Sequence, residues 1–286
     1  MSFSLTHSVY RRNCGIVRMG WCYVSTTTFS DVLASLTAEA DAFRAEPSED
    51  WRQGRTLFGG LSACLAVASA KRAFPDLPPL RSAQLTFIAP VTGELVIKPR
   101  ILRAGKSTTF VAADGTTETG TALQVTLVCG HARRSSHSYR ALPMPHVEPP
   151  DALPNFFSES FAPRFAGHFE ARIAGGAPPI SGAAKPEYLA WLRHRDQSAP
   201  DDISSLMALG DAMPPAALAI FAKFAPISTI TWFVDIFSDR ISGAGWHLMQ
   251  VEAETIGDGY SSQRMVLWDA IGTPVLIARQ NIAIFE

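Results

Sequence analysis

Residues 57–74 read LFGGLSACLAVASAKRAF, and the arrangement of the whole chain can be worked out from them. Apolar and small residues recur at helical spacing behind a Gly-Gly pair, which predicts a long apolar helix. Strands are predicted after it in residues 80–90, 94–105, 107–115 and 120–130, with glycine-containing turns between them. A helix followed by an antiparallel meander is therefore the first structural unit of the chain.

The same order of elements recurs in the second half. A helix is predicted over residues 205–224, SLMALGDAMPPAALAIFAKF, followed by further strands over residues 227–237, 246–259, 260–272 and 273–284. Strands are also predicted before the two helices, in residues 41–47, 167–176 and 187–196. The repeat predicts an α+β protein of two units, each a long helix wrapped by an antiparallel sheet, with the two sheets joined edge to edge.

A proline-rich segment, residues 141–155, separates the two repeats. Proline cannot donate a hydrogen bond to a strand ladder, so this segment is predicted to be a linker. The first unit is then assigned to residues 29–140 and the second to residues 156–286. Residues 1–28 contain arginines but no continuous apolar run, which predicts a disordered tail rather than a secretory signal. A targeting segment and a true start at Met19 are the alternatives for these residues.

Composition narrows the function classes. The chain has 286 residues, 47% of them hydrophobic, and a net charge of -1, so it can bury a large core and offers no global attraction for nucleic acid. Its four cysteines form no C-x-x-C pair and its histidines match no metal motif, so no metal and no cofactor are expected and a cytoplasmic location is predicted. No apolar run is long enough for membrane insertion.

Two short motifs are weak. GKST at residues 105–108 lacks the upstream glycine of a P-loop, because Arg100 stands at that position. GLSAC at residues 60–64 ends in Cys64 where a nucleophile elbow has glycine, so Ser62 is predicted to be a small packed helix residue rather than a nucleophile.

The final strand poses a sharper question. Alternate positions share one face of a strand, and on this strand they carry Pro274, Leu276, Ala278, Gln280, Ile282 and Ile284. A buried carboxamide must be hydrogen-bonded. Gln280 is therefore either a satisfied core residue or a group that holds a water or a substrate carbonyl. Counting from Gly120 as from Gly272 matches Gln280 with Val128, so only the second unit carries a polar residue there.

Two further polar residues lie near the second predicted helix. Asp211 precedes Pro214 and Pro215, which predicts that Asp211 is the N-cap of the helix that follows. Thr229 opens the next strand, and simple alternation places it on the same face as Thr231. The sequence leaves open whether Thr229 points toward Gln280.

The chain resembles the double-hotdog acyl-CoA thioesterases of the thioesterase II-like superfamily. Three stretches carry the resemblance: RTLFGGLSACLAVASA, LGDAMPPAAL with STITWFVDIF, and DAIGTPVLIARQNIAIF. It implies two fused hotdog units, a double hotdog, and a site made of Asp211, Thr229 and Gln280. One position departs from the family pattern, because Thr231 stands where many members have an acidic residue.

The resemblance implies hydrolysis of an acyl-CoA to free acid and CoA. In this scheme Asp211 is the general base, Thr229 and Gln280 orient the water, and Gly59 and Gly60 offer backbone N–H groups to the carbonyl oxygen. A hotdog protein that binds acyl-CoA without hydrolysing it is the alternative. A hydratase is less supported, because it would pair the aspartate with a nearby histidine and the next one is His247. Exposed sheet edges predict a homodimer or higher homo-oligomer.

Overall fold

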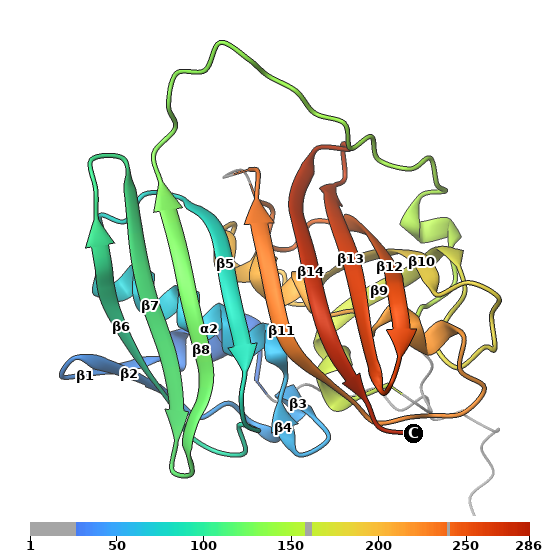
Figure 1. The fold of residues 1–286 in the computed structure, drawn as a ribbon, viewed down its shortest axis with the longest axis horizontal. Coiled ribbons are helices and arrows are strands. Elements are labelled where there is room, and N and C mark those ends of the chain that lie inside the picture. The colour runs from blue at the N-terminus through green and yellow to red at the C-terminus, as the bar shows by residue number, and fades with distance from the viewer. Residues whose placement is uncertain (1–26, 158–161, 239–240) are drawn as a thin grey trace, which may run out of the picture.

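A computed structural model describes residues 27–157, 162–238 and 241–286 (Figure 1). Its centre is one antiparallel sheet of twelve strands in the order β1-β2-β6-β7-β8-β5-β11-β14-β13-β12-β10-β9. The main helix lies behind this sheet in Figure 1, so the sheet has a covered inner face and an outer face. Almost all of the predicted tail, residues 1–28, falls outside the described residues.

The first unit contains α1, β1 to β8 and α2. Its elements are α1 Phe29–Ser35, β1 Thr37–Glu39, β2 Ala42–Ala45, η1 Glu49–Trp51, β3 Arg52–Gln53, β4 Thr56–Leu57, α2 Gly59–Ala73, β5 Leu80–Phe87, β6 Leu95–Ala104, β7 Thr108–Thr117 and β8 Gly120–Gly130. Strands β3 and β4 form a separate two-stranded sheet.

The second unit follows the proline-rich segment. Its elements are η2 Pro150–Ala152, η3 Arg164–His168, β9 Phe169–Gly176, β10 Glu187–His194, α3 Ile203–Gly210, η4 Ala216–Ala219, β11 Ile227–Ile236, β12 His247–Gly257, β13 Tyr260–Asp269 and β14 Pro274–Ile284. The strands predicted from alternating hydrophobicity therefore form, and the predicted double-hotdog arrangement is confirmed.

Helix α2 is buried on every side. All residues from Gly60 to Ala70 are buried, which is expected of a helix without a polar face. Small residues let it approach α3 closely, because a Cβ added at Gly60 would lie 2.9 Å from the carbonyl oxygen of Ala208. The two helices therefore meet near the N-terminus of α2.

The two units join through β5 and β11, which pair antiparallel in the middle of the sheet. Leu85 on β5 is the register partner of Trp232 on β11. A single hydrophobic core includes buried residues of both units. The join makes one continuous inner face, so residues of one unit can reach the helix of the other.

The second helix differs from the prediction. Helix α3 has eight residues and ends at Gly210, so Asp211 is its C-cap and not the N-cap of a following helix. Pro214 and Pro215 lack the N–H groups that a helix needs, and proline disfavours a helical residue before it. A short 3-10 turn, Ala216–Ala219, follows instead.

The predicted linker packs on the outer face of the second unit. The indole N–H groups of Trp268 and Trp191 donate to the carbonyl oxygens of Leu142 and Glu148, both at 2.9 Å. Met144 packs against the cluster of buried residues that these two tryptophans form with Leu248 and Val266. The segment thus covers apolar side chains of the sheet, and Figure 1 shows it passing over the upper ends of the strands. No helix in the described residues has the length and apolar character needed to span a membrane.

Candidate active site

A cavity of about 720 Å³ is lined mainly by residues of the second unit, together with Gln53 and Gly54 of the first. Its walls are mainly aromatic, proline and aliphatic side chains, among them Phe156, Phe165, Pro178, Pro215 and Ile227. The polar side chains of Asp211, Thr229 and Gln280 also line it. Of the described residues in its wall, Asp211 alone carries an ionisable side chain.

Asp211 reaches the start of the other unit's helix. The backbone N–H of Gly60 donates to its carboxylate, and a Cβ added at Gly59 would lie 2.8 Å from its Oδ2 atom. The N-cap residue of α2, Phe58, makes no side-chain cap hydrogen bond. Asp211 therefore satisfies a backbone donor at a helix start, as a capping residue does, but from a different unit.

The environment raises the pKa of Asp211 from 3.8 to about 7. Burial is the main cause, since it disfavours the charged carboxylate. The hydrogen bonds from Gln280 and Gly60 lower the pKa and offset part of this rise. A carboxyl group with a pKa near neutrality can accept a proton at neutral pH and release it again.

Gln280 donates from Nε2 to Oδ1 of Asp211 at 2.5 Å. Its own Oε1 accepts a hydrogen bond from Nε2 of Gln263 at 2.7 Å. Gln263 lies directly opposite Gln280, on β13. Gln263 was not predicted as a site residue, although it shares an inward strand face with Met265 and the alternation that indicates Gln280 applies equally to it.

A bulge decides where Thr229 lies. The pairing of β11 with β14 shifts between Thr229 and Thr231, so Ile230 is an extra residue. Thr229 consequently stands opposite Ile282, which is buried on the same face as Gln280. Without the bulge, alternation would place Thr229 on the outer face with Thr231. Thr229 and Gln280 line one cavity because of this extra residue.

Gly59 and Gly60 both lie where a side chain would not fit. A Cβ at Gly59 would also approach the ring of Phe87 at 3.3 Å, and one at Gly60 would approach the ring of Phe58 at 2.5 Å. The N–H of Gly60 is used by Asp211. Neither glycine is among the described residues that line the cavity, but Gly59 lies beside Asp211 and is the one of the two expected backbone donors that remains a candidate for a substrate oxygen.

The counterpart of Gln280 in the first unit is not Val128. Val128 pairs with Ser82 on the outer face of β5, whereas Val125 pairs with the inward-facing Leu85. Counting from the Gly-Thr turns fails because the hairpins differ in register, and an odd slip moves a residue to the other face. The inward position, Val125, is still apolar, so only the second unit carries a polar residue at this place in the sheet.

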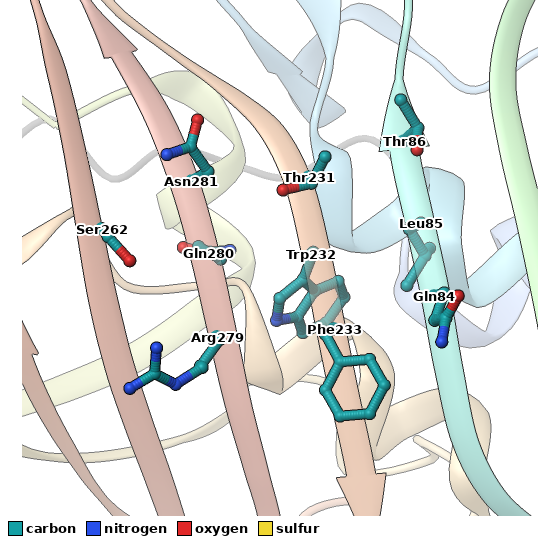
Figure 2. A pocket seen from close by; sticks show the side chains of 10 residues that line it. All are labelled: Gln84, Leu85, Thr86, Thr231, Trp232, Phe233, Ser262, Arg279, Gln280 and Asn281. Atoms are coloured by element: carbon teal, nitrogen blue, oxygen red, sulfur yellow. The ribbon is translucent and has the colours of Figure 1, made fainter.

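The outer face of the same strands has a second hollow, of about 330 Å³. Figure 2 shows Gln280 of β14 between Arg279 and Asn281, with Trp232 of β11 and Leu85 of β5 level with it. The exposed side chains here belong to Gln84, Thr231, Phe233 and Arg279 rather than to the three predicted site residues. This hollow is separated from Asp211 by the sheet.

A serine nucleophile and a metal centre are less well supported. Ser62 is buried inside α2 and its hydroxyl donates to the carbonyl oxygen of Phe58 at 3.4 Å, as expected of a packed helix residue. Within the described residues, no group of three or more His, Cys, Asp or Glu side chains could hold a metal ion.

Two family models match the chain. One is described as the acyl-CoA thioesterase N-terminal domain and covers residues 47–130, and the other, the acyl-CoA thioesterase C-terminal domain, covers residues 142–284. The chain belongs to this acyl-CoA thioesterase family. The segment containing Asp211, Thr229 and Gln280 thus falls within the family's C-terminal domain.

Solved structures share the fold. A protein of unknown function with a hot dog fold from Alicyclobacillus acidocaldarius is 22% identical, with a TM-score of 0.83 over 91% of this chain and 99% of that one. The tesB protein of Mycobacterium avium is 15% identical, with a TM-score of 0.75 over 91% and 100%. An acyl-CoA thioesterase II from Mycobacterium marinum is 18% identical, with a TM-score of 0.71 over 89% and 97%. A search of curated proteins finds no significant match.

Proposed function

We propose that this member of the acyl-CoA thioesterase family hydrolyses an acyl-CoA to a free acid and CoA. The observation that carries the proposal is the contact of Asp211 with both Gln280 and the N-terminus of α2, in the wall of an apolar cavity. Membership of the family supports the same reaction class.

The proposed reaction uses one water. Ionised Asp211 takes a proton from this water while the water oxygen adds to the thioester carbon. The N–H of Gly59 donates to the carbonyl oxygen of the thioester as negative charge develops there. The C–S bond then breaks, and Asp211 returns the proton to the departing thiolate sulfur. The products are the free acid and CoA, and no covalent enzyme intermediate forms.

Thr229 and Gln280 orient the water in this proposal. A threonine hydroxyl can both donate and accept, and the second N–H of the Gln280 amide is available to a group in the cavity. The side chains of Thr229 and Gln280 line the same cavity as Asp211, and this shared position supports these roles.

The cavity favours a neutral, apolar acyl group. The described residues of its lining include no cationic side chain that could pair with a carboxylate on the substrate. Ionised Asp211 would also repel such a carboxylate. Apolar acyl-CoAs are therefore the expected substrates, and acyl groups that end in a carboxylate, such as succinyl, are expected to be poor ones.

Release of free thiol from a panel of acyl-CoAs tests the proposal. We expect thiol release from apolar acyl-CoAs to depend on Asp211. The alternative, a non-catalytic acyl-CoA-binding protein, predicts saturable binding of the same compounds without thiol release, and that result would overturn the proposed hydrolysis. The hydratase alternative predicts water addition to an enoyl-CoA with the thioester intact. No histidine is among the described residues of the cavity wall to support it.

A further inference from the structure

A chain of side-chain amides stands behind Asp211. The backbone N–H of Ala216 donates to Oε1 of Gln263 at 2.9 Å, and Nε2 of Gln263 donates to Oε1 of Gln280 at 2.7 Å. Nε2 of Gln280 then donates to Oδ1 of Asp211 at 2.5 Å. Gln263 is 0% exposed and Gln280 is 3% exposed, so neither amide faces bulk solvent.

The direction of this chain is set at both ends. A backbone N–H can only donate, so Ala216 requires the oxygen of Gln263 to face it. The Gln263 amino group must then face Gln280, whose oxygen accepts, and this leaves the Gln280 amino group facing Asp211. An ionised carboxylate can only accept, so the requirement at the far end agrees. The amide orientations therefore follow from the partners and not from the similar shapes of the two amide ends.

Gln263 cannot act on substrate directly. It lies on β13 behind Gln280, and it is absent from the described residues that line the cavity. Ala216, the donor that orients it, opens the 3-10 turn that follows Pro215. The Gln280 amide is thus held by Gln263 of the neighbouring strand, and Gln263 is held in turn by the backbone N–H of Ala216.

We propose that Gln263 is a positioning residue, which transmits the donor direction of the Ala216 N–H to Gln280 and so keeps the Gln280 amino group turned toward Asp211. This inference rests on the proposed function for its kinetic consequence, but the hydrogen-bond relay exists without it. If Gln263 is lost, the Gln280 amide can rotate and present its oxygen to the carboxylate. In that orientation the oxygen accepts a hydrogen bond from the protonated carboxyl of Asp211 but opposes the ionised one, so loss of Gln263 favours the protonated form of Asp211.

Gln263→Met is the first test variant, because methionine keeps a similar length and removes both polar atoms. We expect kcat to fall about tenfold, the scale of one lost hydrogen bond, with little change in KM because Gln263 does not line the cavity. The midpoint of the acid limb of the pH–rate profile should move upward. Ser262→Ala, a neighbouring change on the opposite face of β13, should leave kcat and the midpoint unchanged.

Ala216→Pro is the second variant and removes the donor at the head of the relay without changing Gln263. Ala216 is the first residue of its turn, where proline is tolerated, and Pro215 before it has φ -56° and ψ 135°, which suits a residue that precedes proline. The same upward shift of the midpoint is expected. If Gln263→Met fails to fold, this variant carries the test.

The decisive readout is the ionisation of Asp211, followed through its carboxyl carbon by NMR in ¹³C-labelled protein. A higher pKa of Asp211 in both variants than in the wild-type protein supports the relay. Variants that are less stable but keep the wild-type pKa and kcat would show that Gln263 only fills the core, and would overturn the inference. Failure of the proposed function is separate, because it appears as absent thiol release in the wild-type protein while the titration still tests the relay.

Discussion

The two main helices begin in opposite ways, and the difference explains where the site lies. Helix α3 begins at its own cap, because the side chain of Asp202 accepts a hydrogen bond from the N–H of Ser204 at 2.8 Å. Helix α2 begins behind Phe58, which offers no side-chain cap, and the acceptor comes from Asp211 of the other unit. The two units thus share one architecture, but α3 is capped by a residue of its own unit, whereas the first turn of α2 lies against Asp211 in the wall of the cavity.

The surroundings of the two carboxylates differ as well. Asp202 forms a partly exposed ion pair with Lys71 at 2.7 Å, whereas burial raises the pKa of Asp211 to about 7. The same residue type at two helix starts is therefore a stabilising cap in one place and a proposed base in the other. Substitutions at the two positions separate these roles.

The largest expected effect comes from Asp211→Asn. Loss of a general base lowers turnover by about 10²–10⁴-fold, while asparagine keeps the shape of aspartate and one of its two acceptor oxygens. Thiol release from the best acyl-CoA of the panel measures the change. Asp202→Asn is the matched control and should keep the wild-type rate, because asparagine is an equally good N-cap. An Asp211→Asn enzyme within tenfold of the wild-type rate would exclude the proposed base.

The same substitution should change how stability depends on pH. Asp211 releases its proton at pH 3.8 when unfolded and at about 7 when folded, so between these values the folded state binds more protons. The contribution of Asp211 to the free energy of unfolding therefore falls as pH rises through this window, by on the order of 1 kcal/mol for each pH unit. Asp211→Asn lacks this loss.

Urea unfolding of both proteins between pH 4 and pH 8 measures the difference. We expect Asp211→Asn to gain stability relative to wild type as the pH rises to about 7, and the difference to level off above it. A difference that stays constant over the whole range would mean that Asp211 is not held in an environment that raises its pKa.

Thr229→Val is expected to have an intermediate effect. Valine keeps the shape of threonine and removes the hydroxyl, so kcat/KM should fall roughly tenfold, as expected for one lost hydrogen bond. Thr231→Val makes the same change two residues away on the outer face, and should leave kcat/KM unchanged. Equal effects from the two variants would show that the bulge at Ile230 does not set the function of Thr229.

The smallest effect is expected at the self-capped helix. Asp202→Ala removes the side-chain acceptor for Ser204 and should cost about 1 kcal/mol of stability, with most of this due to the cap because a partly exposed ion pair contributes little. Thermal unfolding measures the loss, and the thiol-release rate of the folded protein should not change. A loss of activity at constant stability would break the contrast between the two helix starts.

The sequence predicts the local elements well because their signals are local. Alternation over residues 273–284 identifies β14 and shows that Gln280 faces inward, and the apolar run at residues 57–74 identifies α2. The two-unit arrangement follows from the repeat of these signals. Helix α3 was misplaced because Pro214 and Pro215 suit either the start of a helix or the end of one.

The site depends on contacts that periodicity cannot predict. Asp211 meets Gly60 only because β5 and β11 join the two units. Thr229 faces the cavity only because Ile230 is an extra residue in its strand, and a single inserted residue reverses the face without a clear sequence signal. Gln263 could have been found, since a second polar residue on an inward strand face needs the same explanation as Gln280.

The most direct test of the central claim is the pH dependence of kcat/KM for thiol release. With Asp211 as the general base, kcat/KM should rise with pH and reach a plateau, with a midpoint near the pKa of about 7 that its buried position produces. The residual activity of Asp211→Asn should lack this rise. A wild-type profile that is flat from pH 5 to pH 9, or a rise that persists unchanged in Asp211→Asn, would contradict the assignment.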